Sequence, residues 1–170
     1  MKDPEEVVRR LGSPPPDDLI ELHKNRPARV AMVWEPRIIM LVTERLAEMD
    51  TSGSRAALAN LTRGPSREMK RWAVKALAEK PHEDAVDDFM RALDDEDSDA
   101  RSWAAQALGV LQYPQAATRI VPMLEGRSST ERVSAGKALA QLGQEEGIQA
   151  VRRARRKEWR PWVRVQLPRV

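Results

Sequence analysis

A block of sequence recurs every 31 residues, and this period constrains the fold more than any other feature of the chain. Alanine-leucine pairs at 76–77, 107–108 and 138–139 stand in register. The alanines three positions earlier and the basic residues six positions earlier repeat at the same interval: Ala73, Ala104 and Ala135, and Lys70, Arg101 and Arg132. A period of this length is typical of stacked helical hairpins, in which no unit can bury its apolar face alone.

The composition favours an all-α chain. The 170 residues include one Phe, one Tyr and no Cys, so few segments suit a β-strand, and disulfides, thiolate chemistry and cysteine-based zinc sites are excluded. No stretch approaches the ~20 apolar residues that span a bilayer, and the N-terminus carries no apolar signal segment. We therefore expect a cytoplasmic protein that does not associate with a membrane.

The clearest repeat unit covers residues 98–128. Apolar residues at three- and four-residue spacing predict a first helix from Ala100 to Leu111, N-capped by Ser98 or Asp99. A second helix is expected over 115–125, bent where Pro122 removes a backbone donor. The other units have the same plan, with first and second helices at 66–79 and 83–93, and at 130–142 and 145–157, and with a degraded unit at 36–64.

The two ends of the chain depart from the period. Residues 1–35 are interpreted as an atypical N-terminal cap, and residues 158–170 as a C-terminal cap helix that begins near Pro161 and stops before Pro168. With the repeats at 36–157, we expect one domain over 1–170: an all-α α-solenoid. It would be a right-handed superhelix of about four repeats plus caps.

The repeats resemble a known family. Residues 98–124 contain an acidic loop, Ala100-Arg101, the run Ala-Ala-Gln-Ala-Leu-Gly and a Pro-containing turn. This pattern is similar to the HEAT-like repeats first described in phycobilisome lyases, whose consensus places valine where this chain has Met69, Ala100 and Glu131. The resemblance covers about residues 66–157. It implies the helical fold and says little about activity, because many unrelated functions use this scaffold.

The motif arginine has a structural interpretation. Lys70, Arg101 and Arg132 each begin a first helix and can pair with the acidic loop before it, and Asp97 and Asp99 are the expected partners of Arg101. That loop, residues 94–99, lacks the glycine and terminal glutamate of a helix-loop-helix calcium site. The two histidines form no pair at metal-ligand spacing, and no catalytic motif is visible. We expect no metal, no cofactor and no catalytic residue.

In such arrays the resemblance implies that the first helices line a concave surface. Trp72 and Trp103 occupy the same position of successive repeats and would form a row about 10 Å apart. Aromatic anchors dominate many binding interfaces. The alternative is that each indole leans over its helix and packs against the next repeat. The predicted concave binding residues are Arg71, Trp72, Lys75, Ser102, Trp103, Gln106, Ser134 and Lys137.

The positive charge is concentrated at the C-terminus. Residues 151–170 hold eight basic residues and one acidic residue, whereas residues 65–150 have a net charge of −4. On a helix, Arg152, Arg155 and Arg156 share one face, and Arg153 and Lys157 share a neighbouring one. With Arg160 these form a basic patch that suits nucleic acid or an acidic protein, although a solvated terminal helix has the same pattern.

The leading hypothesis from the sequence is a non-enzymatic scaffold or adaptor that binds another protein through the concave helix face. The alternative is a nucleic-acid-binding protein that uses the basic C-terminal patch. A DNA glycosylase fits less well, because Ala76 and Ala107 lie where a carboxylate would be needed one turn from each tryptophan. A bilin lyase-type subunit is suggested only by the resemblance.

Overall fold

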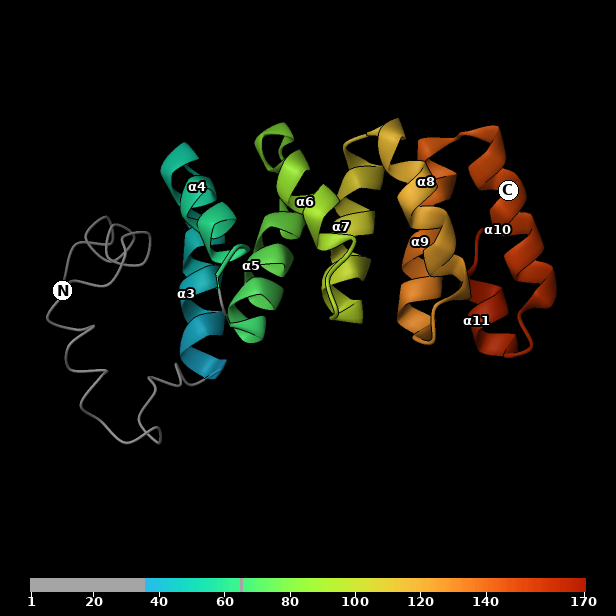
Figure 1. The fold of residues 1–170 in the computed structure, drawn as a ribbon, viewed down its shortest axis with the longest axis horizontal. Coiled ribbons are helices and arrows are strands. Elements are labelled where there is room, and N and C mark those ends of the chain that lie inside the picture. The colour runs from blue at the N-terminus through green and yellow to red at the C-terminus, as the bar shows by residue number, and fades with distance from the viewer. Residues whose placement is uncertain (1–35, 65) are drawn as a thin grey trace, which may run out of the picture. The chain divides into compact units, whose positions relative to one another are not determined.

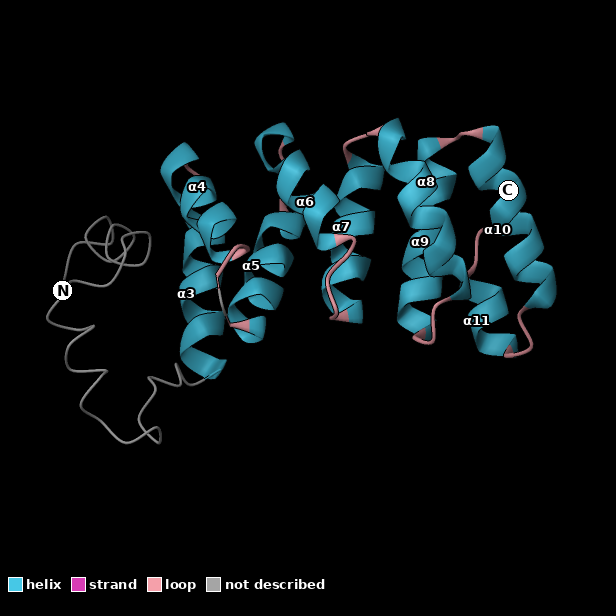
Figure 2. Ribbon diagram, in the orientation of Figure 1, coloured by secondary structure: helices cyan, strands magenta, loops and turns pink. Residues whose placement is uncertain are grey.

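The computed structural model of the chain describes residues 36–64 and 66–170, and the expected cap at 1–35 lies outside the described residues (Figure 1). The described residues belong to two compact units, one ending at Ala76 and the other covering Leu77–Val170. All regular structure in the described part of the chain is helical, with no strand (Figure 2). This confirms the all-α fold class.

The first unit contains a helical hairpin. Helix α3 (Pro36–Met49) begins at the predicted proline, and α4 (Ser52–Leu61) follows it after a short turn. Thr51 caps α4: its side chain accepts a hydrogen bond from the Ser54 backbone N–H, and the Ser54 side chain accepts one from the Thr51 N–H. Ile39 and Leu46 of α3, and Leu58 and Leu61 of α4, supply buried apolar side chains.

Helix α5 (Arg67–Glu79) begins in the first unit and ends in the second. The second unit continues with η2 (Glu83–Ala85), α6 (Val86–Ala92), α7 (Ser98–Val110), η3 (Pro114–Ala116), α8 (Ala117–Ile120) and η4 (Val121–Glu125). It ends with α9 (Ser129–Leu142), α10 (Glu145–Lys157) and α11 (Pro161–Gln166). The alternation of first and second helices follows the predicted period.

Local chemistry explains the helix ends of the second unit. Asp97, rather than the predicted Ser98 or Asp99, is the N-cap of α7, and its buried carboxylate accepts from the N–H groups of Asp99 and Ala100. The predicted distortion at Pro122 is a change to 3₁₀ geometry in η4. Gly143 ends α9 at φ +68°, as predicted for a left-handed C-cap.

Helices α7 and α9 form the most extensive contact between elements in the second unit, and they run side by side in Figure 1. Small residues permit this approach: Ala104 and Ala135 are fully buried, and a Cβ added to Gly109 would lie 2.9 Å from the Cα of Ala138. Two side-chain bonds cross the contact, from Gln106 Nε2 to Ser134 Oγ at 2.9 Å and from Gln112 Nε2 to the Gln141 carbonyl at 3.0 Å. The two repeats are therefore held in register.

The C-terminal segment packs against the last repeat. Val163 of α11 is fully buried, and Leu167 is 2% exposed beside Gly136 of α9. A Cβ at Gly136 would lie 2.7 Å from Leu167 Cδ2, so the glycine leaves the space that the leucine fills. Trp162 and Val165, on the opposite side of α11, remain exposed. One face of this segment therefore covers α9, and its role as the C-terminal cap of the array stays a prediction.

Candidate functional site

The exposed side of the α7–α9 pair carries a continuous stripe of side chains, which we call the first-helix face. Gln106, Lys137 and Gln141 are exposed, Val110 is 56% exposed, and Trp103 is half-buried at one end of the α7 stripe. Spacings of three and four residues place the α7 members on one side of their helix. Because the Gln106–Ser134 bond fixes the two helices in register, the stripe spans two repeats as one surface.

Two residues predicted for this surface are not on it. Ser102 is 1% exposed and Ser134 is 4% exposed, so the prediction that they face solvent is wrong. The Ser102 hydroxyl donates to the Ser98 carbonyl at 2.6 Å, and Ser134 accepts from Gln106. Both hydroxyls are small enough to satisfy their hydrogen bonds inside the contact between helices, which a spacing argument cannot detect.

Trp72 belongs to the first unit and lies among cations. The guanidinium carbon of Arg71 is 5.6 Å, and Nζ of Lys75 is 5.2 Å, from the centroid of its ring. All three side chains are half-buried. Cations attracted to the electron-rich ring hold this indole at the surface of α5. Neither Trp72 nor Trp103 is a fully buried core residue, and neither is fully exposed.

The motif arginines make the same contacts in successive repeats. Arg101 Nε donates to Glu131 Oε1 at 2.6 Å, and Arg132 Nε donates to Glu158 Oε2 at 2.8 Å. In each case Nη1 donates to carbonyls of the preceding loop, those of Asp95 and Glu96 for Arg101 and those of Gly126 and Arg127 for Arg132.

The predicted structural role of these arginines is confirmed, but the carboxylate that receives Arg101 Nε is not in the preceding loop. It belongs to Glu131, in the following repeat, and Asp97 instead caps α7. The bond to Glu131 raises the pKa of Arg101 in spite of the opposing effect of burial. Burial pushes the pKa of Glu158 upward, but bonds and charges from Arg132 and Arg160 outweigh it, and the pKa is lowered.

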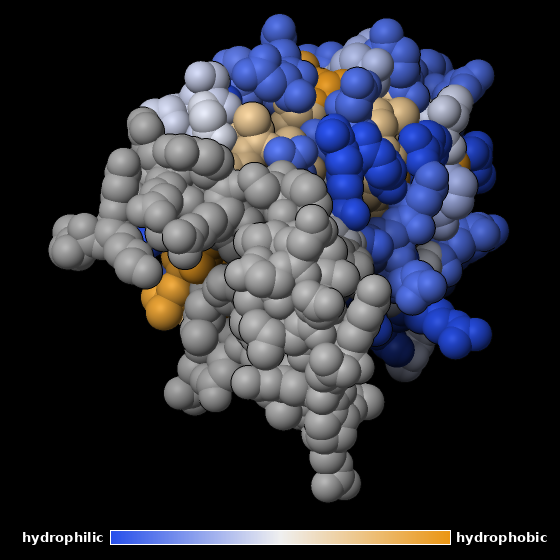
Figure 3. Space-filling view, turned by 60° about the vertical axis from the view of Figure 1, so that its left-hand side comes forward, coloured by the Kyte–Doolittle hydropathy of each residue, from blue (hydrophilic) through white to orange (hydrophobic). Residues whose placement is uncertain are grey.

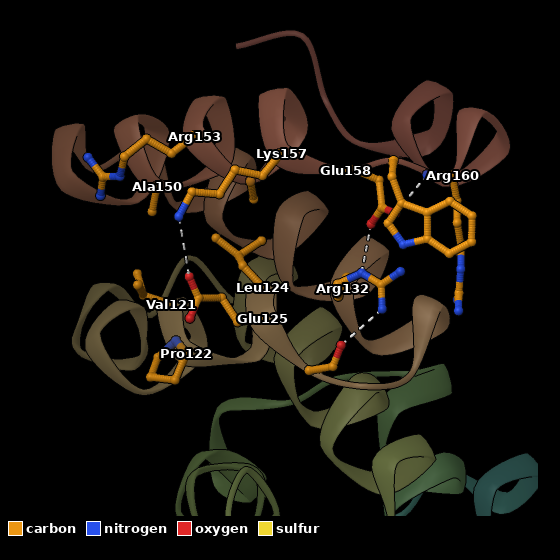
Figure 4. A pocket seen from close by; sticks show the side chains of 13 residues that line it. Val121, Pro122, Leu124, Glu125, Arg132, Ala150, Arg153, Lys157, Glu158 and Arg160 are labelled. Atoms are coloured by element: carbon orange, nitrogen blue, oxygen red, sulfur yellow. Dashed lines mark hydrogen bonds and ion pairs between the residues drawn. The ribbon is translucent and has the colours of Figure 1, made fainter.

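The structure divides the basic run of α10 between two sides, as the helical spacing predicted. On one side, Arg153 and Lys157 line a cavity of about 560 Å³ together with Glu125 and Arg132 (Figure 4). Lys157 Nζ lies 4.0 Å from Glu125 Oε1. Trp159 borders this cavity with 76% of its surface exposed, and the Arg160 guanidinium carbon lies 5.0 Å from its ring centroid. This side mixes both signs of charge.

On the other side of α10, arginines from three segments surround a hollow of about 500 Å³. We call this group the arginine cluster: Arg152, Arg155, Arg156, Arg164 and Arg169. No acidic side chain lines it. The sequence prediction contained the α10 members and omitted Arg164 and Arg169, which α11 and the segment after it bring to the same place. Arg164 could have been included from the sequence, because it lies near the start of α11 much as Arg132 lies near the start of α9.

Other chemistry is sparse in the described residues. They contain no group of three or more His, Cys, Asp or Glu side chains arranged to hold a metal ion. None of their helices combines the length and apolar composition needed to cross a bilayer. On the face of the molecule in Figure 3, hydrophilic residues cover most of the described surface and apolar areas are small.

These features define a class of protein: tandem helical hairpins joined through small residues, with polar, charged and aromatic side chains on exposed helix faces. The comparison with protein families identifies it more closely. Residues 54–135 match the family model for HEAT repeats, and this part of the chain is similar to that family. The search of curated proteins finds no match.

Proposed function

We propose that this protein is a non-enzymatic scaffold that binds another protein through the first-helix face. HEAT repeats commonly serve as protein-interaction scaffolds. The observation that carries the proposal is the register of α7 and α9, fixed by Gly109 against Ala138 and by the Gln106–Ser134 bond. A surface held rigid before binding loses little conformational entropy when a partner docks.

The side chains of this face suit such a role. Trp103 offers a large, stiff aromatic anchor, and Gln106 and Lys137 offer polar groups beside it. The first unit carries a related group on α5, in which Arg71 and Lys75 both lie near the ring of Trp72. We propose this α5 group as a separate contact region for the partner.

Nucleic acid is the less favoured partner. A duplex is bound through phosphate contacts spread along a basic surface. Here residues 65–150 have a net charge of −4, and the excess of positive charge is confined to residues 151–170.

The test replaces exposed residues so that folding is preserved. The double variant Val110→Arg/Lys137→Glu changes the first-helix face and keeps the Gln106–Ser134 bond, and Gln115→Arg/Arg127→Glu makes the same changes in charge at exposed positions in η3 and the loop before α9. Partners of the tagged wild-type protein, identified by quantitative mass spectrometry in its native cells, should fall at least severalfold in the first variant only. Equal retention by both variants contradicts the proposal, provided that their melting temperatures match the wild type.

A further inference from the structure

The arginine cluster has a surplus of positive charge that no carboxylate side chain of the described residues neutralises. None of its five arginines forms an ion pair with an Asp or Glu of the described residues, whereas Arg101 and Arg132 are each paired. Arg152 and Arg164 use Nε to bind main-chain oxygens, those of Val170, the last residue of the sequence, at 2.8 Å and of Glu158 at 2.9 Å. Nε of Arg155 is buried and has no hydrogen-bond partner. Like charges held this close together favour an anion between them.

The motif arginines of the two preceding repeats show which anion such an arginine binds in this chain, namely a carboxylate. Arg101 and Arg132 each bind a carboxylate through Nε and a carbonyl six residues earlier through Nη1. Arg164 has the same relation to the Glu158 carbonyl, also six residues earlier, but reaches it with Nε. Its terminal nitrogens therefore remain for another acceptor, and a guanidinium presents them in the fork geometry that matches a carboxylate.

Exposed apolar side chains lie on the helix that carries one of these arginines. Trp162 is 55% exposed and Val165 is 74% exposed on the same α11 helix as Arg164. Their spacing of three residues places them on one side of the helix, and Arg164 lies about 100° around the helix axis from Val165. An exposed indole and an exposed valine together offer apolar surface that a purely charged ligand would leave in water.

We propose that the arginine cluster and the Trp162–Val165 stripe of α11 bind an acidic amphipathic segment of a partner protein. Its carboxylates would enter the cluster, and its apolar side chains would cover the stripe. The inference rests on the proposed function only in taking the partner to be a protein, and it concerns a different surface from the first-helix face. The compact hollow favours a short acidic segment over a nucleic-acid duplex, which needs a longer basic track.

The experiment uses the full chain and a fluorescent helical peptide of Glu, Leu and Ala, with glutamates along one side and leucines along the other. The test variant is Arg156→Glu/Arg169→Glu, both in the cluster and both exposed. The matched control is Arg153→Glu/Lys157→Glu, with the same change in charge on the neighbouring face of α10, outside the cluster. Two lost charge-assisted contacts should weaken peptide binding at least about tenfold in the test variant. The control should bind as the wild type does.

Two further arms separate the alternatives. Trp162→Ala should weaken binding of this peptide severalfold but leave binding of a single-stranded DNA oligonucleotide unchanged. The inference is overturned if the wild type does not bind the peptide, if both charge-reversal variants lose it equally, or if the oligonucleotide binds the cluster more tightly than the peptide at physiological salt. None of these outcomes bears on the first-helix face, so the failure of this inference and that of the proposed scaffold function are distinguishable.

Discussion

Arg101 and Glu131, thirty positions apart in the chain, form a hydrogen-bonded ion pair that joins two successive helical repeats, with Nε and Oε1 separated by 2.6 Å. The Glu131 side chain is 4% exposed and that of Arg101 is 23% exposed. A carboxylate this buried is stable only with its partner in place. Arg132 and Glu158 repeat the arrangement one unit later, so these bonds act together with the apolar core to hold the repeats in register.

Removing the buried carboxylate should therefore destabilise the second unit. We expect Glu131→Ala to lower the free energy of unfolding by about 2–3 kcal/mol, because the Arg101 guanidinium loses its carboxylate while partly buried. The control is Glu125→Ala, which removes an exposed carboxylate 4.0 Å from Lys157 and should change the stability by less than about 0.5 kcal/mol. Urea unfolding followed by circular dichroism measures both. Equal effects would show that the Arg101 pair has no special role.

Stability should fall in acid partly through Glu158. Its pKa is lowered in the folded protein, so its contribution is present above the ordinary value of 4.5 and is lost as the pH falls through the lower folded value. The variant Glu158→Gln lacks this titration. We expect the wild type to be more stable than the variant at pH 7 and the difference to shrink below about pH 4.5. A difference that stays constant from pH 7 to pH 3, measured by denaturant unfolding, would argue against this account.

Gly109 should be intolerant of even a methyl group. In Gly109→Ala, the new Cβ would lie 2.9 Å from the Cα of Ala138 and 2.5 Å from Gln141 Oε1, so α7 and α9 must separate. We expect a loss of about 1–2 kcal/mol in spite of the better helix propensity of alanine. Gly53→Ala in α4 is the control, since its Cβ meets nothing closer than 3.9 Å, and it should raise stability slightly. Thermal unfolding distinguishes the two, and a stabilised Gly109→Ala variant would show that the helices are not in close contact.

The N-cap of α7 gives a prediction with a conservative counterpart. Asp97→Ala should cost about 1–2 kcal/mol, because the N–H groups of Asp99 and Ala100 lose their acceptor. Asp97→Asn keeps an acceptor oxygen at the same place and should retain most of the stability. If both variants unfold at the same urea concentration, the charge of Asp97 rather than its capping bonds accounts for the effect.

The sequence predicted the elements that depend on local pattern. The boundaries of α10, the left-handed end of α9 at Gly143 and the distortion at Pro122 follow from periodicity and backbone chemistry. It failed for contacts between repeats, because the partner of Arg101 and the burial of Ser102 depend on how neighbouring helices meet. The division of the arginines of α10 into two sides was predictable from helical spacing. The addition of Arg164 and Arg169 required the path of the chain after α10.

Several sequence predictions stay predictions. These are the single domain over 1–170, the right-handed superhelix, the cytoplasmic location, and the absence of catalytic residues, metal and cofactor. The binding roles of the first-helix face, the α5 group and the basic residues are likewise proposals, and their tests differ because the surfaces differ.

Site-specific photo-crosslinking in native cells tests the central claim most directly. A photoreactive residue placed at the exposed position of Val110 should yield a discrete crosslinked product with a partner protein, and the same residue at Gln115 in η3 should not. Crosslinks of equal yield from both positions, or none from Val110 in a variant that melts as the wild type does, would contradict the proposal that the first-helix face binds a protein.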